Sequence, residues 1–461
     1  MGNYKKLLNN SILFAIGNFG SKFITFLLVP FYAHYLSAEQ FGISDTMLTT
    51  ITNLIAPVVF LSIYDAVLRF GLDSSYDKEK VISNSIFIGI FGFCIALVFL
   101  PILMLTSFKI YIHYFYILLA LAFFQNLFGQ YARSKGKVQL FSLNGILLSI
   151  FIAMFSYIFI VQLRKGLDGF FLAQIIAYSL SDIILFFGSD ACHDISPKFV
   201  TKQDIRILLI YSIPLVPNSI MWWLMTVSSR YLVLYLSGAY WTGLFVVASK
   251  FPSLLSTVNQ VFIQAWQISA VEEERSTTAV DYYTTVFKSL ASMLFISSSL
   301  LTMLIKPLFS ILFSSDYFTA WYLVPLLTLG TIFSAFSDYF TTNYIVSKKT
   351  EGILRTSMYG GLVNFLLNIV LITFLGLVGA ALSNAISFFV IFLLRYYGTK
   401  DIVDVKIDWT QIYGSILLII LQLILLFFDL EIMLLIQFLL LICIVYLNKF
   451  FICTLINKIV R

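Results

Sequence analysis

The chain has 461 residues, of which 60% are hydrophobic and 11% charged, and its mean hydropathy is +0.94. An average soluble domain is about one quarter charged, so this composition excludes an ordinary soluble protein. The net charge of +6 is spread over short loops, which indicates membrane topology and argues against a nucleic-acid partner.

Apolar segments long enough to cross a bilayer follow one another along the chain, and such a crossing needs roughly 20 helical residues. They lack the alternation of membrane β-strands, so helices are the remaining way to satisfy the backbone in lipid. We predict an all-α polytopic membrane protein with about 14 transmembrane helices. In chain order these spans are 10–36, 42–70, 81–106, 111–131, 138–162, 168–189, 206–236, 244–270, 280–306, 320–345, 353–374, 377–397, 410–428 and 431–455.

The first apolar segment has no A-x-A-like cleavage site, so we expect it to stay as the first span. If the N-terminus is cytoplasmic, most Lys and Arg residues fall in inner loops. The outer loops then hold only Lys109, Arg164, Lys165 and Lys306. This bias predicts that both termini are cytoplasmic.

Short motifs recur in the two halves of the chain. The sequence YLS at 35–37 precedes an outer turn that ends at Gly42, and YLS at 235–237 precedes one that ends at Gly243. Ser-Lys at 134–135 matches 347–348, and the pattern Gly-Leu-x-Gly at 166–169 matches 376–379. Shared membrane-loop composition is the alternative explanation of these matches.

The repeat predicts two six-helix lobes that cross the membrane in the same direction, with a cavity between them. The predicted domains are an N-terminal lobe over 1–200, a C-terminal lobe over 201–400 and an accessory helix pair over 401–461. Apart from Ser415, Gln422 and Gln437, this last pair is almost wholly apolar. We therefore expect it to face lipid.

Four cations fall inside predicted spans, where a charge costs roughly 2.5–3.5 kcal/mol near the helix centre and usually faces a cavity or a partner. Lys22 falls near the membrane midplane on the polar first span. Arg230 and Lys250 flank the 237–243 turn at one depth, and Lys288 falls in the inner half. The inner half of the spans also contains three acids, Asp65, Asp182 and Asp338.

Ion pairing between helices is the alternative interpretation of these cations. Asp65 and Arg69 are spaced i,i+4 and are expected to pair at the inner interface. Asp338 falls at about the depth of Lys288 and is expected to neutralise it. The other three cations have no acid obviously at their depth, which favours a cavity for them.

The sequence resembles the polysaccharide biosynthesis flippases that move O-antigen or capsule repeat units, within the multidrug/oligosaccharidyl-lipid/polysaccharide (MOP) exporter superfamily. The resemblance covers essentially the whole chain. It depends on GNFGSK at 17–22, YLSAEQFG at 35–42, DAVLRF at 65–70 and the six-plus-six arrangement. The peptidoglycan lipid flippases are similar in their fourteen spans, and their final pair helps to form a groove for the lipid tail.

The resemblance implies an oligosaccharide linked through pyrophosphate to undecaprenol, carried from the inner to the outer leaflet by alternating access. Lys22, Arg230 and Lys250 would then bind the pyrophosphate. Weaker candidates for the sugar hydroxyls are Asn18, Asn218, Asn259 and Gln260. Membrane lipid, a polysaccharide polymerase and chain-length machinery are the implied partners, and coupling to an ion gradient or to the membrane potential is open.

Two other classes of function fit the sequence less well. A Na⁺- or H⁺-coupled multidrug antiporter of the same superfamily usually has acids near the start of its first lobe, whereas residues 11–36 contain Lys22 and no Asp or Glu. A glycan polymerase or ligase would need a large outer loop with Arg and His, and no predicted outer loop is large. The scattered cysteines and histidines support no metal, haem or other cofactor.

Overall fold

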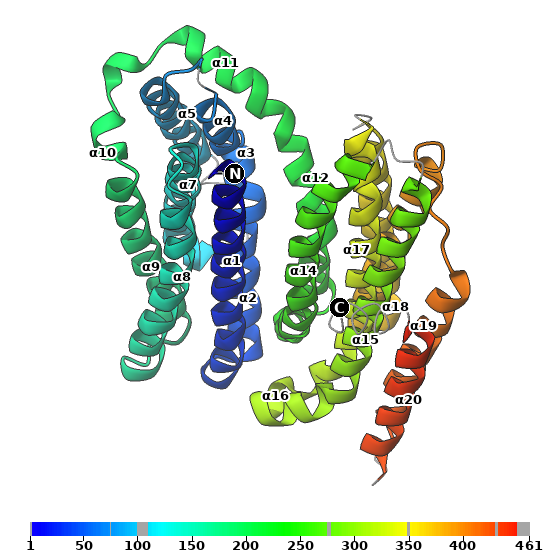
Figure 1. Ribbon diagram of the computed structural model, residues 1–461. Helices are drawn as coiled ribbons and strands as arrows, with labels where there is room; N and C mark the ends of the chain where they lie inside the picture. The colour runs from blue at the N-terminus through cyan, green and yellow to red at the C-terminus, as the bar shows by residue number, and fades with distance from the viewer. Residues whose placement is uncertain are drawn as a thin grey trace. The chain divides into compact units, whose positions relative to one another are not determined.

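The computed structural model describes residues 2–73, 75–98, 109–273, 278–347, 351–428 and 432–449. The side chains of residues 2–16, 18, 268, 271 and 272 lie outside this description. The described residues form helices joined by short turns, with no strand among them, as the all-α prediction requires (Figure 1). They fall into two compact units, the first comprising 1–36 and 43–227 and the second 37–42 and 228–461.

In the first unit, α1 packs along α8, α8 along α9, and α9 along α7. Small residues allow this close packing, because a Cβ built on Gly17 of α1 would lie 2.7 Å from the Ser142 Cβ of α8. The main elements are α1 (Gly2–Tyr35), α2 (Ala38–Thr50), η1 (Ile51–Ile55), α3 (Ala56–Val59), α4 (Ile63–Gly71), α5 (Lys78–Val98), α7 (Ile112–Ser134), α8 (Val138–Ser156), η3 (Tyr157–Gln162), α9 (Gly166–Gly188), α10 (Ala191–Asp194), α11 (Lys202–Ser212), η5 (Ile213–Leu215) and α12 (Val216–Thr226).

The predicted span 42–70 is bent in the structure. Its two parts, Ala38–Val59 and Ile63–Gly71, meet at 70°. The bend follows from Leu61 and Ser62, whose φ angles of 52° and 49° lie in the left-handed region that interrupts a helix. This apolar segment is therefore not one continuous helix but is broken at Leu61 and Ser62.

In the second unit, α17 packs against α18, α14 and α15 around a core of aromatic rings. Trp266 stacks on Tyr339 with ring centroids 4.7 Å apart, and Phe287 lies 5.3 Å from the same tyrosine. The elements are α13 (Ser228–Leu236), α14 (Ala239–Glu273), α15 (Ala279–Leu312), α16 (Ser315–Phe318), η6 (Thr319–Tyr322), α17 (Leu323–Val346), α18 (Glu351–Gly398), α19 (Trp409–Leu425) and α20 (Met433–Leu447).

The predicted domain boundaries differ from this division. The first unit extends to Val227, so α11 and α12 belong to it, and the predicted span 206–236 is divided among α11, η5, α12 and α13. Pro214 at η5 and Pro217 in α12 explain the first of these interruptions, because proline cannot continue the helical hydrogen bonding. The helices α19 and α20 group with the second unit.

Eight helices in the described ranges are long and apolar enough to cross a membrane, or nine if the bent pair is one span. One of them is the 48-residue α18, which contains a kink at Gly376. The kink separates the predicted spans 353–374 and 377–397. The shorter apolar helices α19 and α20 lie at the last two predicted spans.

The glycine motif that recurs in the sequence has the same geometry in both units. Gly166 and Gly376 have φ angles of 52° and 58°, which an L side chain rarely adopts. Three residues later, a Cβ on Gly169 would lie 2.9 Å from the Phe159 carbonyl oxygen, and one on Gly379 would meet the Leu371 carbonyl oxygen. Each motif thus turns the chain sharply and packs the next helix onto the backbone of the previous one.

The C-terminal pair has an apolar exterior, where Leu417 is 65% exposed. Its polar residues are buried instead of facing lipid. Gln437 Nε2 donates to the Gln422 carbonyl oxygen at 2.9 Å, and Asn448 Nδ2 donates to Ser415 Oγ at 3.0 Å. Such bonds hold membrane helices together, because an unpaired amide in lipid is costly.

Candidate functional site

Two of the predicted pyrophosphate cations lie in the second unit, on consecutive helices. Arg230 lies in the first turn of α13 and is only 9% exposed, and its Nη2 donates to Ser249 Oγ on α14 at 3.4 Å. Lys250 follows Ser249 directly and is half-buried. The short turn between α13 and α14 therefore folds Arg230 onto the residue that precedes Lys250.

Next to Arg230 in the chain, Ser229 contacts buried amides of α18 that the sequence analysis missed. Asn368 Nδ2 donates to Ser229 Oγ at 3.0 Å and to the Asn364 carbonyl oxygen at 2.9 Å. Asn364 and Asn368 are almost fully buried, at 1% and 0% exposed. Their i,i+4 spacing on an otherwise apolar helix is the signal that would have revealed them.

Lys22 belongs to the first unit and is exposed on α1. Its neighbour Ser21 lines a cavity of about 210 Å³ between α1, α7 and α8. Several of the side chains that line this cavity are polar, and one of them, Asn144, donates from its Nδ2 to Ser181 Oγ of α9 at 2.7 Å. The other lining residues are Gly17, Gln125, Asn126, Gln130, Phe141, Ser142 and Gly145. Lys22 thus follows in the chain a residue that lines the cavity, and its own side chain is exposed.

The four residues predicted to bind sugar have different environments. Asn218 on α12 and Gln260 on α14 are exposed. Asn259 is 4% exposed and donates to Asp338 Oδ2 at 3.3 Å, which places it in the interior of the second unit. The side chain of Asn18 lies outside the described residues.

Neither predicted ion pair forms. Arg69 contacts Asp73 at 3.6 Å. This pair also has i,i+4 spacing, but Asp73 follows Arg69 in the chain and lies just beyond the end of α4. Lys288 lies 3.9 Å from Asp408, just before α19. Instead, Asp338 accepts a hydrogen bond from Asn259, and the nearby cation that acts electrostatically on Asp65 is Arg133.

Arg395, near the end of α18, is a buried cation that the sequence analysis did not single out. It is 5% exposed and lies within a cluster of hydroxyls from α17 and α18. Its Nη1 donates to Ser337 Oγ at 2.7 Å and to Thr341 Oγ1 at 2.5 Å, and its Nη2 donates to Ser357 Oγ at 2.9 Å. The guanidinium also acts electrostatically on Asp338.

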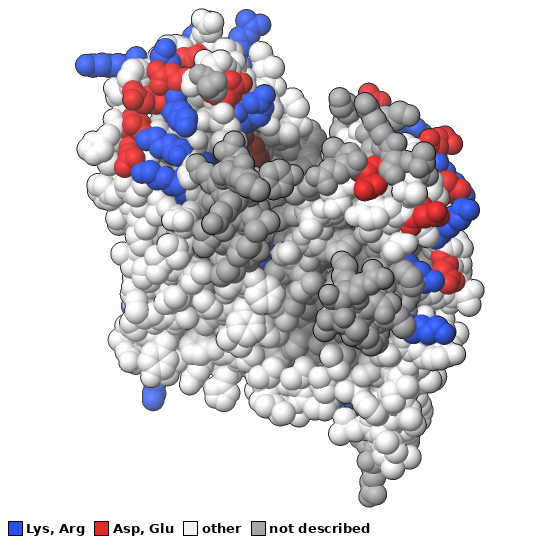
Figure 2. Space-filling view, in the orientation of Figure 1, with Lys and Arg blue, Asp and Glu red and all other residues white. Residues whose placement is uncertain are grey.

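The charged side chains of the first unit gather at the end that includes α10 and α11 (Figure 2). Lys137 Nζ contacts Asp190 Oδ2 at 2.5 Å, and Tyr131 donates to Asp194 Oδ2 at 2.6 Å. Lys135 pairs with both acids. The hydrogen bond from Lys137 is the main cause that lowers the pKa of Asp190. This network ties the segment after α9 to the loop between α7 and α8.

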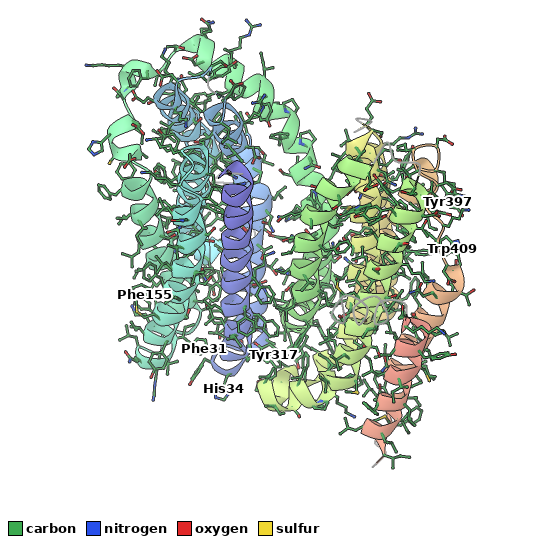
Figure 3. The ribbon with its side chains drawn as sticks, in the orientation of Figure 1. Phe31, His34, Phe155, Tyr317, Tyr397 and Trp409 are labelled. Atoms are coloured by element: carbon green, nitrogen blue, oxygen red, sulfur yellow. The ribbon has the colours of Figure 1, made fainter. Side chains whose placement is uncertain are left out.

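Aromatic residues mark the opposite end of the same unit. Phe31, His34 and Phe155 lie toward the end remote from the charged cluster (Figure 3). Phe31 packs on Tyr35 with ring centroids 5.1 Å apart, and His34 packs on Tyr35 at 5.0 Å. Aromatic rings of this kind are typical of a membrane–water interface. The first unit therefore has the charge and aromatic distribution of a protein that spans a bilayer.

Comparisons with known proteins agree with this fold. The sequence pattern of the family described as "Polysaccharide biosynthesis protein" matches residues 7–268. The curated proteins include no match to the chain.

Solved structures with a similar fold include an inward-facing multidrug resistance MATE family transporter of the MOP superfamily. It has 16% identity and a TM-score of 0.69, with 83% of this chain and 95% of that chain covered. The lipid II flippase MurJ in an inward closed conformation has 18% identity and a TM-score of 0.69, with 98% and 100% covered. A MOP superfamily transporter from Pyrococcus furiosus, described as having a binding pocket of reverse polarity, has 14% identity and a TM-score of 0.60, with 85% and 96% covered.

Proposed function

Because the chain belongs to the polysaccharide biosynthesis protein family, we propose that it is a flippase for an oligosaccharide linked through pyrophosphate to undecaprenol. It would carry this lipid from the inner to the outer leaflet of the bacterial cytoplasmic membrane by alternating access. Both termini would lie in the cytoplasm. The product would serve O-antigen, capsule or other surface polysaccharide assembly.

The observation that carries this proposal is the contact of the buried Arg230 with Ser249, the residue that directly precedes Lys250. A pyrophosphate has about two negative charges, and its oxygens are bound best by cations in a site of low dielectric constant. Arg230 is largely withdrawn from solvent, so its interaction with an anion is little screened by water. Lys22, which follows the cavity-lining Ser21 in the first unit, is a further cation that we propose to bind the pyrophosphate.

Substitution of the two neighbouring cations tests the proposal. Arg230→Ala and Lys250→Ala should each cause lipid-linked glycan to accumulate in the inner leaflet, with normal amounts of protein in the membrane. Arg230→Lys should be milder, because the charge stays while the planar fork of the guanidinium is lost. The matched control is Arg355→Ala, which removes an exposed cation of the same unit that lies over the Tyr359 ring.

If the Arg230→Ala and Lys250→Ala variants export glycan as well as the Arg355→Ala control does, the pyrophosphate binds elsewhere and the site assignment is wrong. Reduced export together with reduced protein in the membrane would make both residues structural. The amount of protein is therefore measured in the same membranes.

The second candidate is an antiporter for cationic drugs, which the similarity to the MATE transporter favours. The two candidates require binding residues of opposite charge, because a pyrophosphate is an anion and the drugs are cations. Lys22→Glu should abolish glycan export by repelling the pyrophosphate, whereas a cation antiporter would tolerate or benefit from the added acid. We propose a transporter rather than an enzyme, with membrane lipid, a polymerase and chain-length machinery as partners.

A further inference from the structure

Four carboxamide side chains line the cavity between α1, α7 and α8 of the first unit. They are Gln125, Asn126 and Gln130 of α7 and Asn144 of α8, and the cavity has a volume of about 210 Å³. One water molecule needs only about 10–15 Å³, whereas a pocket for a drug-sized ligand has roughly 300–1,000 Å³. The space is therefore large enough for several waters or for one small ring, and too small for a whole oligosaccharide.

A serine of α9 holds two of these amides in fixed orientations. Asn144 Nδ2 donates to Ser181 Oγ at 2.7 Å, and Ser181 donates to Gln125 Oε1 at 2.9 Å. The other ends of the two amides, the acceptor Oδ1 of Asn144 and the donor Nε2 of Gln125, have no hydrogen-bond partner among the described residues. Asn144 is only 2% exposed, and leaving a buried acceptor unpaired is costly. The arrangement thus calls for a partner from outside the chain.

The other two amides of the cavity have the same property. Asn126 Nδ2 donates to the Ala122 carbonyl oxygen one turn earlier at 2.8 Å, which leaves Asn126 Oδ1 as an acceptor. Gln130 Oε1 accepts from Arg133 Nη1 at 2.8 Å, which leaves Gln130 Nε2 as a donor. Within the described part of the chain, neither of these ends has a partner. The four amides together therefore keep two acceptors and two donors for a ligand.

The charge of the lining residues narrows the class of ligand. Besides the amides, the described lining consists of two glycines, two serines and Phe141, and none of these is ionisable. An anion is bound best by charged donors, and an organic cation by an acid or by several aromatic faces. A hydroxyl group is neutral and both donates and accepts. An uncharged ring with several hydroxyls therefore matches this set of donors and acceptors.

The lining also includes an apolar surface and an opening. Phe141 is the one aromatic ring among the described lining residues, and the C–H face of a sugar ring packs well on such a ring. On α8, a Cβ built on Gly145 would lie 4.0 Å from the Cβ and Oγ of Ser21, which is ordinary contact. Position 145 therefore has room for a methyl group, whereas a longer side chain there would fill the cavity.

From these contacts we infer that this cavity binds one uncharged sugar ring of the cargo. The hydroxyls of the ring pair with Gln125, Asn126, Gln130 and Asn144, and its apolar face packs on Phe141. This inference rests on the proposed function, because it takes the cargo to be a lipid-linked glycan. It adds a site that recognises the carbohydrate itself, apart from the cations that bind the pyrophosphate. Ordered water alone would pair with the same amides, and the experiment separates the two cases.

The test is saturation-transfer NMR on the purified full-length chain, in a detergent without a sugar headgroup. The probes are the methyl glycosides of glucose, galactose and N-acetylglucosamine, with methyl glucuronide as the charged counterpart. The wild type should transfer saturation to at least one neutral glycoside and much less to the glucuronide. Equal transfer to the glucuronide would overturn the assignment of an uncharged ring.

The variants follow from the contacts of the cavity. Gly145→Leu should abolish the transfer by filling the space, and Gly145→Ala should keep it. Asn126→Leu should weaken binding by about two- to tenfold, the effect of one neutral hydrogen bond. The described bond of Asn126 lies within its own helix, so this variant covers the case in which Gly145→Leu fails to fold. The matched control is Gln174→Met on α9, which removes a buried amide that does not line the cavity.

Two results would overturn the inference. Transfer that Gly145→Leu and Asn126→Leu leave at the level of Gln174→Met would place the sugar elsewhere. An absence of transfer to all three neutral glycosides would show that the cavity holds water only.

An export assay separates the inference from the proposed function. In cells, Gly145→Leu should make lipid-linked glycan accumulate in the inner leaflet, and Gly145→Ala should not. Sugar binding that depends on the cavity, in a protein that exports no lipid-linked glycan, would refute only the flippase proposal. Export that Gly145→Leu leaves unchanged, together with no sugar binding, would refute only the sugar site.

Discussion

We expect Arg395→Ala to destabilise the second unit more than removal of any exposed cation there. The guanidinium donates five hydrogen bonds, to Ser337, Thr341, Thr356 and Ser357. At about 1.5–3 kcal/mol for each bond to a charged group, a simple sum would exceed about 7 kcal/mol.

That sum is too large for two reasons. The hydroxyls of Thr341 and Thr356 also donate to carbonyl oxygens one turn earlier in their own helices, so they stay satisfied without Arg395. In addition, the substitution removes the cost of burying the guanidinium. Loss of one member of a buried charged network typically costs about 3–5 kcal/mol, and we expect Arg395→Ala to fall in that range.

The measurement is thermal unfolding of the purified protein in detergent. At roughly 2 °C per kcal/mol, the apparent melting temperature should fall by about 6–10 °C. Arg395→Lys should give an intermediate loss, since it keeps the charge but cannot reach both pairs of hydroxyls. The control Arg355→Ala removes an exposed cation from the same helix and should change the melting temperature little. Equal melting temperatures for Arg395→Ala and Arg355→Ala would refute the reasoning.

Three further predictions concern the site, the topology and the glycine motif. Lys22→Ala should abolish flipping and Lys22→Arg should keep part of it, measured as lipid-linked glycan in the inner leaflet; full activity of Lys22→Ala would remove this residue from the site. Gly376→Ala should lower the stability of the protein by about 1–2 kcal/mol, because residue 376 has a positive φ angle. Gly379→Ala should lower it further, because the new Cβ would meet the Leu371 carbonyl oxygen. If both variants are as stable as the wild type, the turn can relax and the reasoning is wrong. Single cysteines that replace Lys165 or Asp316 should react with an impermeant thiol reagent added outside the cell. Single cysteines that replace Lys202 or Lys400 should react only from the inside. The reverse pattern would overturn the predicted orientation.

The sequence predicted the helical fold well because its signals are local. A membrane span is visible in the sequence as a run of apolar residues. The turns at Gly166 and Gly376 are visible as a repeated motif, and glycine is needed there because both residues have a positive φ angle. That α13 and α14 are neighbours could also be predicted, because one short turn joins these helices. Each of these predictions needed only neighbouring residues in the chain.

The predictions that failed required a knowledge of contacts. The i,i+4 rule suits Asp65 and Asp73 equally as partners of Arg69, and nothing local selects the second, which the structure shows at 3.6 Å. From the sequence alone, Arg395 near the end of an apolar helix looks like a residue that reaches toward the headgroups. The hydroxyls that surround it lie on α17 and elsewhere on α18, far from it in the sequence, so no local pattern reveals them. Such networks form only after the helices pack.

The reciprocal bonds between α19 and α20 have a consequence for biogenesis. Gln422 and Gln437 each donate to the backbone carbonyl of the other, at 3.4 Å and 2.9 Å. A single helix that left the translocon alone would carry an unsatisfied amide into the lipid, whereas the two helices together would not. We therefore expect the pair to be released as a preformed hairpin, and a glycosylation-mapping assay on chains truncated between the two helices should show α19 inserting poorly until α20 has been synthesised.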